Sequence, residues 1–287
     1  MVVATLLWSM AGVVTRQLGP VTGFEATFWR SAFNASALLV LLARLRGPAA
    51  LRQTLLSADR TLWLSGLCWA VMFTAFMVAI TMTTVANVLV TMAIAPLLTA
   101  LVARVVLGQR LPVRTWAAIV VAGAGIAWMH AHELALVDSR HFVGTAIALA
   151  VPVAAALNWT AIQRSRHGRA DLLAGVLIGA VLSSIATLPV AAPLRASAHD
   201  IAWLAFLGVA QLAVPCLIAV AAARVLAAPE VALLSLLEIV FGVTWTWIGA
   251  AEAPSRHVLE GGALVLGALV ANESIALRQR RPVAGAT

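Results

Sequence analysis

The sequence contains no lysine, and only 10% of its 287 residues are charged. A soluble domain of this size carries about 25% charged residues. Hydrophobic residues make up 62% of the chain, so no long polar stretch remains that could form the surface of a large soluble domain. The composition therefore predicts a protein that crosses the membrane several times.

Cysteine is also scarce. Cys68 and Cys216 both lie inside apolar runs, where a free cysteine is typically a small buried hydrophobic residue. The sequence has no CxxC motif, no His/Cys spacing typical of a metal site, no catalytic triad and no phosphate-binding loop. We therefore expect no metal, no cofactor and no enzymatic activity.

Apolar runs recur along the whole sequence. A membrane helix needs about 20 such residues to cross a hydrocarbon core of ~30 Å. We predict an all-α membrane protein with ten transmembrane helices. The ten runs are Val2–Arg16, Gly23–Ala43, Leu62–Thr81, Val85–Val106, Val113–Met129, Phe142–Gln163, Leu172–Ala192, Ile201–Leu226, Val231–Gly249 and His257–Leu277. Residues 130–141 form the most polar connection and are expected to separate two halves.

The second half resembles the first. The stretch Pro229–Ala271 repeats the pattern of a stretch that begins at Ala86, and Glu252 falls on Gln109 with an offset of 143 positions (252 − 109). Weak internal symmetry in an apolar chain is typical of transporters built from repeats. Five spans per repeat are an odd number of crossings, so the second repeat must be inverted. We expect one repeat over residues 1–135, an inverted one over 142–278 and a basic tail over 279–287.

The arginines predict the orientation. Fourteen of the nineteen lie in connections after even-numbered spans or in the tail, four lie in the opposite connections, and Arg30 lies within the second span. Positive charge accumulates on the cytoplasmic side of membrane proteins. We therefore expect a bacterial-type inner membrane location with both termini in the cytoplasm, and we interpret the basic charge as a membrane signal, with no nucleic-acid partner.

Two ionisable residues are predicted deep in the membrane. Glu238 lies about 13 Å into the membrane, counted from Pro229, and Arg30 about 11 Å into the second span, counted from Gly23, at ~1.5 Å per residue. Ionisable groups at such depth are costly and indicate a functional site. The alternatives stay open: Glu238 as a protonated packing group, and Arg30 as a structural tie to helix-end carbonyls. Arg30 is expected to pair with Glu238 or to hold a substrate carboxylate.

Prolines, amides and aromatic residues inside the spans complete the candidate site. Prolines leave carbonyls without a donor, and midspan amides serve either as ligand contacts or as contacts between helices. An aromatic stripe on the third span is expected to pack in the core or to face a ligand. The candidate substrate-binding residues are Trp8, Arg30, Trp69, Phe73, Pro96, Asn158, Gln211, Glu238 and Trp245.

Several stretches are similar to the EamA family of the drug/metabolite transporter superfamily. They are Leu6–Ser9, Phe28–Ser31, Ala95–Thr99, Leu107–Leu111, Leu236–Val240 and the glycines of spans five and ten. The resemblance implies two inverted five-helix repeats, alternating access and export of amino acids or other small metabolites. The sequence departs from the family pattern at Gln109, where glutamate is frequent, and at Ile239, where proline is frequent. A hinge is therefore expected at Pro96 in the fourth span and is not supported in the ninth.

We thus expect a secondary transporter that exports a small metabolite from a site between the two repeats. The alternative is a passive channel or facilitator for small polar solutes, which predicts a continuous polar stripe that no span shows. A receptor or structural role is not excluded by the sequence. Substrate, direction, proton coupling and the choice between monomer and homodimer stay open, and membrane lipid is the other expected partner.

Overall fold

The computed structural model describes residues 1–108, 110–135, 139–164, 172–222 and 234–280, and in this part of the chain the helices are joined by connections, without β-strands. The helices are α1 (Val2–Thr15), α2 (Gly23–Arg46), α3 (Pro48–Leu56), α4 (Arg60–Met82), α5 (Val85–Met92), α6 (Ala95–Leu107), α7 (Val113–Ala135), α8 (Ser139–Arg164), α9 (Leu172–Ala191), α10 (Ala198–Gly208), the π-helix η1 (Val209–Ala213), α11 (Val214–Ala222), α13 (Leu237–Ala250) and α14 (Arg256–Arg280).

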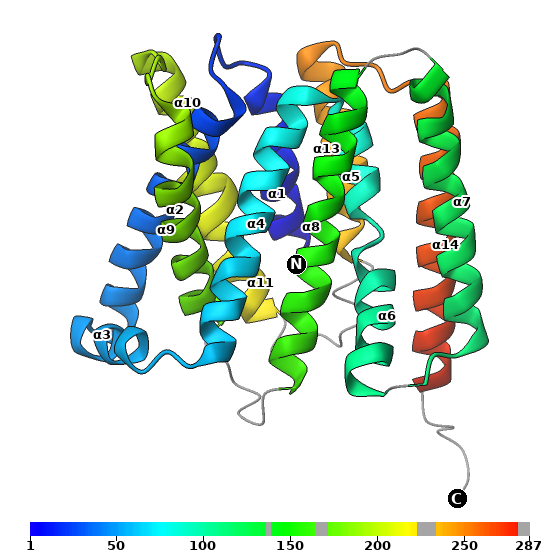
Figure 1. The fold of residues 1–287 in the computed structure, drawn as a ribbon, viewed down its shortest axis with the longest axis horizontal. Coiled ribbons are helices and arrows are strands. Elements are labelled where there is room, and N and C mark those ends of the chain that lie inside the picture. Colours follow the sequence, from blue (N-terminus) through cyan, green and yellow to red (C-terminus); the bar gives the residue numbers. More distant parts are fainter. Residues whose placement is uncertain (109, 136–138, 165–171, 223–233, 281–287) are drawn as a thin grey trace, which may run out of the picture.

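Most helices run side by side between two ends of the molecule (Figure 1). Among the described residues, seven helices are long and apolar enough to cross a membrane, and three shorter apolar helices accompany them, Val2–Thr15, Val113–Met129 and Leu237–Ala250. The predicted class of all-helical membrane protein is confirmed. The count of ten membrane crossings and the inverted repeat stay predictions.

Short polar side chains fix where several helices begin. The hydroxyl of Thr22 accepts a hydrogen bond from the backbone at the start of α2, Thr84 does the same for α5, and the Asp59 carboxylate caps α4. At α10, Ser197 and Asp200 cap each other's backbone reciprocally. Such caps satisfy the N–H groups that a helix leaves unpaired in its first turn. They place the start of each span at a defined depth.

Two connections differ from the sequence prediction. Residues 48–56, expected to be a connection, form α3, which follows a glycine turn at Gly47 with φ of 83°. The polar connection predicted over residues 130–141 is wrong in extent, because α7 continues to Ala135 and α8 begins at Ser139. Polar residues in the last turns of a membrane helix are compatible with helix when those turns lie outside the hydrocarbon, which the apolar pattern alone does not reveal.

The fourth predicted span is broken, as its proline indicated. Helix α5 ends at Met92 and α6 begins at Ala95, one residue before Pro96. Pro96 has no N–H to donate to the Met92 carbonyl, so the helix cannot continue through this point without a lost bond. The chain turns at Ala93 and Ile94 and then resumes its course toward the same end of the molecule (Figure 1).

A matching break lies in the ninth predicted span. Leu236 forms a turn, and α13 begins at Leu237. The offset of 143 places Ala93 on Leu236 (236 − 93), so the two breaks fall at related positions of the two halves. A hinge was not supported here by the sequence, because Ile239 stands where proline is frequent, and the turn at Leu236 forms without a proline. Residues 223–233, which include the start of the predicted span, lie outside the described part.

The eighth predicted span contains a π-helix. The five residues from Val209 to Ala213 lie between α10 and α11, and Pro215 follows four residues after Gln211. A proline ring collides with the carbonyl four residues before it and cannot donate to it. The wider π turn relieves this conflict at Gln211 and keeps the segment helical. Single π turns of this kind are frequent at functional sites.

Several helix ends that carry arginines lie at the same end of the molecule. The end of α2, all of α3, the end of α6 and the start of α7 lie at the same end of the molecule as the end of α14 (Figure 1). The arginines Arg46, Arg52, Arg104 and Arg114 belong to these segments.

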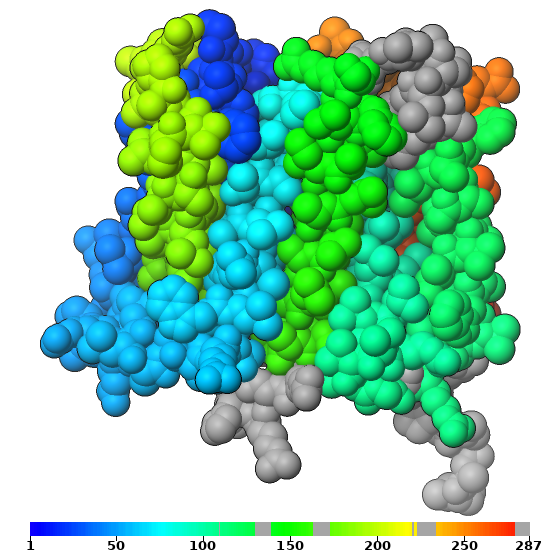
Figure 2. All heavy atoms as spheres, in the orientation of Figure 1, coloured from blue at the N-terminus to red at the C-terminus, as the bar shows by residue number. Residues whose placement is uncertain are grey.

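One face of the bundle is closed along its centre, where the side chains of α4 and α8 meet (Figure 2).

Candidate functional site

The bundle encloses a central cavity of about 360 Å³. Its lining comes from α1, α2, α4, α5, α6, α8, α9, η1, α11 and the start of α13, so both halves of the chain contribute. This volume is in the range of cavities that hold small organic molecules, about 300–1,000 Å³. The cavity is therefore the candidate binding site.

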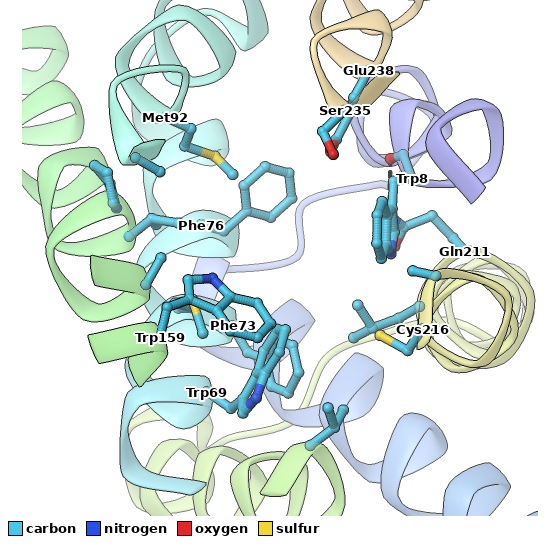
Figure 3. Close-up of a pocket in the computed structure, with 18 of the residues that line it drawn as sticks. Trp8, Trp69, Phe73, Phe76, Met92, Trp159, Gln211, Cys216, Ser235 and Glu238 are labelled. Atoms are coloured by element: carbon cyan, nitrogen blue, oxygen red, sulfur yellow. Dashed lines mark hydrogen bonds between the residues drawn. The ribbon is translucent and has the colours of Figure 1, made fainter. Parts of the chain in front are cut away.

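Aromatic and sulfur-containing side chains form most of the wall. They are Trp8, Trp69, Met72, Phe73, Phe76, Met92, Trp159 and Cys216. Trp69 and Phe73 lie one turn apart on α4, with their ring centroids 5.4 Å apart. Figure 3 shows Trp69, Phe73 and Trp159 close together on one side, opposite Trp8, Gln211 and Cys216. Such a wall offers flat, polarisable surfaces to an apolar or aromatic ligand body.

Arg30 is the basic group of the cavity wall. Its side chain is buried, and the residue is only 3% exposed. Its Nη2 donates to Gln211 Oε1 at 2.9 Å, and its guanidinium carbon lies 5.5 Å from the centroid of the Phe76 ring. Its Nε has no hydrogen-bond partner among the described residues. A guanidinium has five N–H donors, so Arg30 retains donors that an anionic ligand group can use.

Gln211 holds Arg30 in place. While its oxygen accepts from Arg30, its Nε2 donates to the Trp8 carbonyl at 2.9 Å. The amide thereby links α1, α2 and η1, and both of its ends are used. Gly208, at the end of α10, lets this segment approach closely, because a Cβ there would collide with the Arg30 carbonyl and with Phe33.

Glu238 and Ser235 lie at the break before α13. Glu238 is the second residue of α13, and both side chains lie at one end of the cavity (Figure 3). The Glu238 carboxylate is half-buried and close enough to Arg30 for the two charges to interact. No ion pair joins them within the described part of the chain. Opposite charges therefore share one cavity without neutralising each other by direct contact.

The structure brings together six of the nine residues predicted for the site. Trp8, Arg30, Trp69, Phe73, Gln211 and Glu238 line the cavity. The other three are outside its lining: Asn158 is buried, Pro96 follows the lining residue Ala95, and Trp245 is 39% exposed on the outer surface. Helical spacing puts Trp245 seven residues, or about two turns, after Glu238 and near the same face of the helix, but the Trp245 ring is exposed.

Some lining residues were not predicted. Trp159 and Pro152 both line the cavity from α8, and their spacing of seven residues puts them on one helical face. This spacing can be recognised in the sequence, where Trp159 directly follows the predicted site residue Asn158. Cys216 was interpreted only as a buried residue; it lies five residues after Gln211 and lines the cavity with it. No sequence signal pointed to Met92, which is the last residue before the break in the fourth span.

An all-helical membrane protein with a mixed polar and aromatic cavity at its centre has the architecture of a small-molecule carrier. Residues 1–130 match the model of the EamA-like transporter family. The resemblance predicted from the sequence is thus confirmed by the match over residues 1–130, and this family is part of the drug/metabolite transporter superfamily. Members of that family are transporters, not enzymes.

The fold is also found in a solved structure. One protein crystal structure is similar over 97% of this chain and 96% of its own length, with a TM-score of 0.66 and 18% sequence identity. At that identity the similarity shows the fold alone. No curated protein sequence matches the chain significantly.

Proposed function

We propose that the protein is a secondary transporter of a bacterial-type inner membrane, which exports a small metabolite by alternating access. The metabolite binds in the central cavity between the two halves. The family match over residues 1–130 and the all-helical membrane fold support the general class. The cavity supports the choice of a small, partly apolar cargo.

The observation that carries the proposal is the buried Arg30 beside an unpaired carboxylate. A charged group in the membrane interior is found only where an opposite charge, polar groups or a water-filled cavity compensate its charge. Gln211 accepts one hydrogen bond from the Arg30 guanidinium, and the Arg30 Nε is left without a partner among the described residues. A ligand carboxylate fits these remaining donors, because guanidinium and carboxylate match in charge and in planar geometry.

Glu238 extends the argument to a second ligand group. Its carboxylate lies in the same cavity as Arg30, with the Ser235 hydroxyl at the same end (Figure 3). A ligand ammonium group fits Glu238, and an apolar or aromatic body fits the walls around Trp69 and Phe73. The cargo class is therefore a zwitterion with an apolar body, an amino acid or a related compound.

Alternating access is supported by the two helix breaks. Met92 and Ala95 flank one break and Ser235 and Glu238 flank the other, and all four line the cavity. Transporters built from repeats bind their cargo at broken helices and rearrange around them. Breaks at related positions of the two halves are what a pair of inverted repeats would supply.

We infer the orientation in the membrane from charge. The end of the molecule that carries α3 and the ends of α2 and α6 is rich in arginine, and we assign it to the cytoplasm. The end of α14 lies at this end (Figure 1), and we assign both termini to the same side. Cargo loaded at that side would leave at the opposite, periplasmic side.

A ligand screen on the purified protein tests the proposal. Binding to the folded state raises its stability, by about 2.7 kcal/mol at a ligand concentration of 100 times Kd. Among amino acids, nucleosides and amines, we expect stabilisation by amino acids with large apolar side chains and its loss in Arg30→Gln. Trp245→Ala, on the outer surface, serves as the matched control and keeps the response. Stabilisation by amines alone, or an equal shift in Arg30→Gln, would refute the proposed site.

A further inference from the structure

At the end of the molecule opposite α3, one ion pair connects the two halves of the chain. Arg16 Nε donates to Glu252 Oε2 at 2.6 Å. Arg16 follows the last residue of α1, and Glu252 lies two residues after the end of α13. The pair is only partly exposed, with 27% of the Arg16 side chain and 18% of the Glu252 side chain accessible.

Each partner also holds the junction between α4 and α5. Arg16 Nη1 donates to the Ile80 carbonyl at 2.7 Å, and its Nη2 donates to the Thr83 carbonyl at 3.0 Å. On the other side, Glu252 Oε1 accepts from the Val85 backbone N–H at 2.7 Å. The guanidinium therefore satisfies carbonyls at the end of α4, and the carboxylate satisfies an unpaired N–H at the start of α5. Charge-assisted bonds of this kind are the stronger ones in proteins.

Tight packing continues from this ion pair toward the cavity. A Cβ at Gly12 of α1 would collide with Val85 of α5 and with Thr246 of α13. Gly242 of α13 is packed in the same way against Leu89 of α5. The three helices α1, α5 and α13 thus meet without space between them. The cavity, lined by Trp8, Met92 and Glu238, lies farther along the same helices.

We propose that Arg16 and Glu252 form a latch that closes this end of the cavity and must open for cargo to pass there. The inference rests on the proposed alternating access. Opening requires α1 and α13 to separate from the α4–α5 junction, which breaks the three hydrogen bonds between the ion pair and Ile80, Thr83 and Val85 together. The latch stabilises the state in which the cavity is shut at the periplasmic end.

The sequence makes the latch one-sided. In the sequence, the repeat offset of 143 places Glu252 on Gln109, and a glutamine carries no charge with which to form an ion pair. The equivalent position therefore does not supply an ionic latch, and the resting carrier is biased toward closure at the Arg16 end.

Cys216 supplies a natural reporter, because it lines the cavity and is only 4% exposed. In a Cys68→Ala background it is the sole thiol of the chain. The experiment measures the rate at which a membrane-impermeant maleimide, added to each side of sealed vesicles in turn, labels Cys216. Glu252→Gln removes the charge but keeps an acceptor for Val85. We expect it to raise labelling from the Arg16 end at least fivefold.

Two further variants keep the test decisive. Arg16→Lys retains the positive charge but lacks the fork that reaches Glu252 and two carbonyls at once, so it should also raise labelling. Glu260→Gln breaks an exposed ion pair with Arg256 on α14 and should change nothing. Unchanged labelling in both latch variants, or an equal rise in Glu260→Gln, overturns the latch. The labelling assay needs no substrate, so it tests the latch independently of transport. If the latch variants raise labelling but the protein transports no amino acid, the proposed function is refuted and the latch is not.

Discussion

Gln211 accepts a hydrogen bond from Arg30 at 2.9 Å, although 181 positions separate them in the sequence. The contact joins a buried guanidinium of the first half to a π-helical amide of the second half, which in turn is fixed by the Trp8 carbonyl. Gln211 therefore acts as a positioning residue: it sets the direction of the Arg30 donors that remain for a ligand.

Substitutions at Gln211 separate positioning from packing. Gln211→Leu leaves the Arg30 Nη2 without its partner, which costs about 1–3 kcal/mol for a buried polar group. Gln211→Glu instead supplies a carboxylate that occupies Arg30. We expect Gln211→Leu to lower both thermal stability and ligand affinity, and Gln211→Glu to keep stability while abolishing binding. Ligand binding by Gln211→Glu at wild-type affinity would remove Arg30 from the ligand site.

Arginine itself should be required at position 30. Arg30→Lys keeps the charge but loses the planar fork and the donor that reaches Gln211. Binding of a carboxylate ligand should fall at least tenfold in Arg30→Lys and further in Arg30→Gln, measured by isothermal titration on the purified protein. Recovery of full affinity in Arg30→Lys would show that only the charge matters.

Glu238 is expected to act on the ligand and not as the direct partner of Arg30. Glu238→Gln should keep the fold and impair transport. Since the two charges interact but no ion pair joins them in the described part of the chain, the coupling between Glu238→Gln and Arg30→Gln in unfolding free energy should stay below about 1 kcal/mol. A double variant that is much more stable than the sum of the two single effects would indicate a direct pair.

The aromatic wall can be tested with two tryptophans. Trp69 lines the cavity, whereas Trp245 is exposed on the outer surface. Trp69→Ala should weaken binding of aromatic ligands at least tenfold more than binding of small aliphatic ones. Trp245→Ala should change neither by more than about twofold. The same selectivity change in both variants would mean that the cavity is not where the ligand body binds.

The membrane orientation has a direct check. Gln53 lies in α3 at the arginine-rich end, and Ser255 lies in the connection between α13 and α14 at the other. Both are exposed. In a cysteine-free background, Gln53→Cys should react with an impermeant maleimide from the cytoplasmic side and Ser255→Cys from the periplasmic side. Reaction of both from one side would refute the predicted crossings.

Local chemistry made part of this structure predictable. Apolar run length indicated the helices, Pro96 indicated the break between α5 and α6, and the depth of Arg30 and Glu238 indicated a site at the centre. Helix α3 was missed because its nine residues are too short and too mixed to stand out as a span. The turn at Leu236 was missed because no proline accompanies it in the sequence.

The contacts between the two halves could not be predicted from the sequence. Gln211 reaches Arg30 because a π turn rotates it and because Gly208 lets two helices approach, and neither effect has a local signature. For the same reason helical spacing placed Trp245 with Glu238, while the packing of α13 against α1 turns that ring outward. The pairing of Arg16 with Glu252 likewise depends on how α1 and α13 end beside each other.

The measurement that tests the central claim most directly is exchange of a radiolabelled amino acid across proteoliposomes that contain the purified protein. A carrier with one cavity between Arg30 and Glu238 predicts saturable uptake, acceleration by unlabelled ligand on the opposite side, and loss of both in Glu238→Gln. Uptake that rises linearly with concentration and ignores ligand on the opposite side would contradict the account and indicate a passive channel.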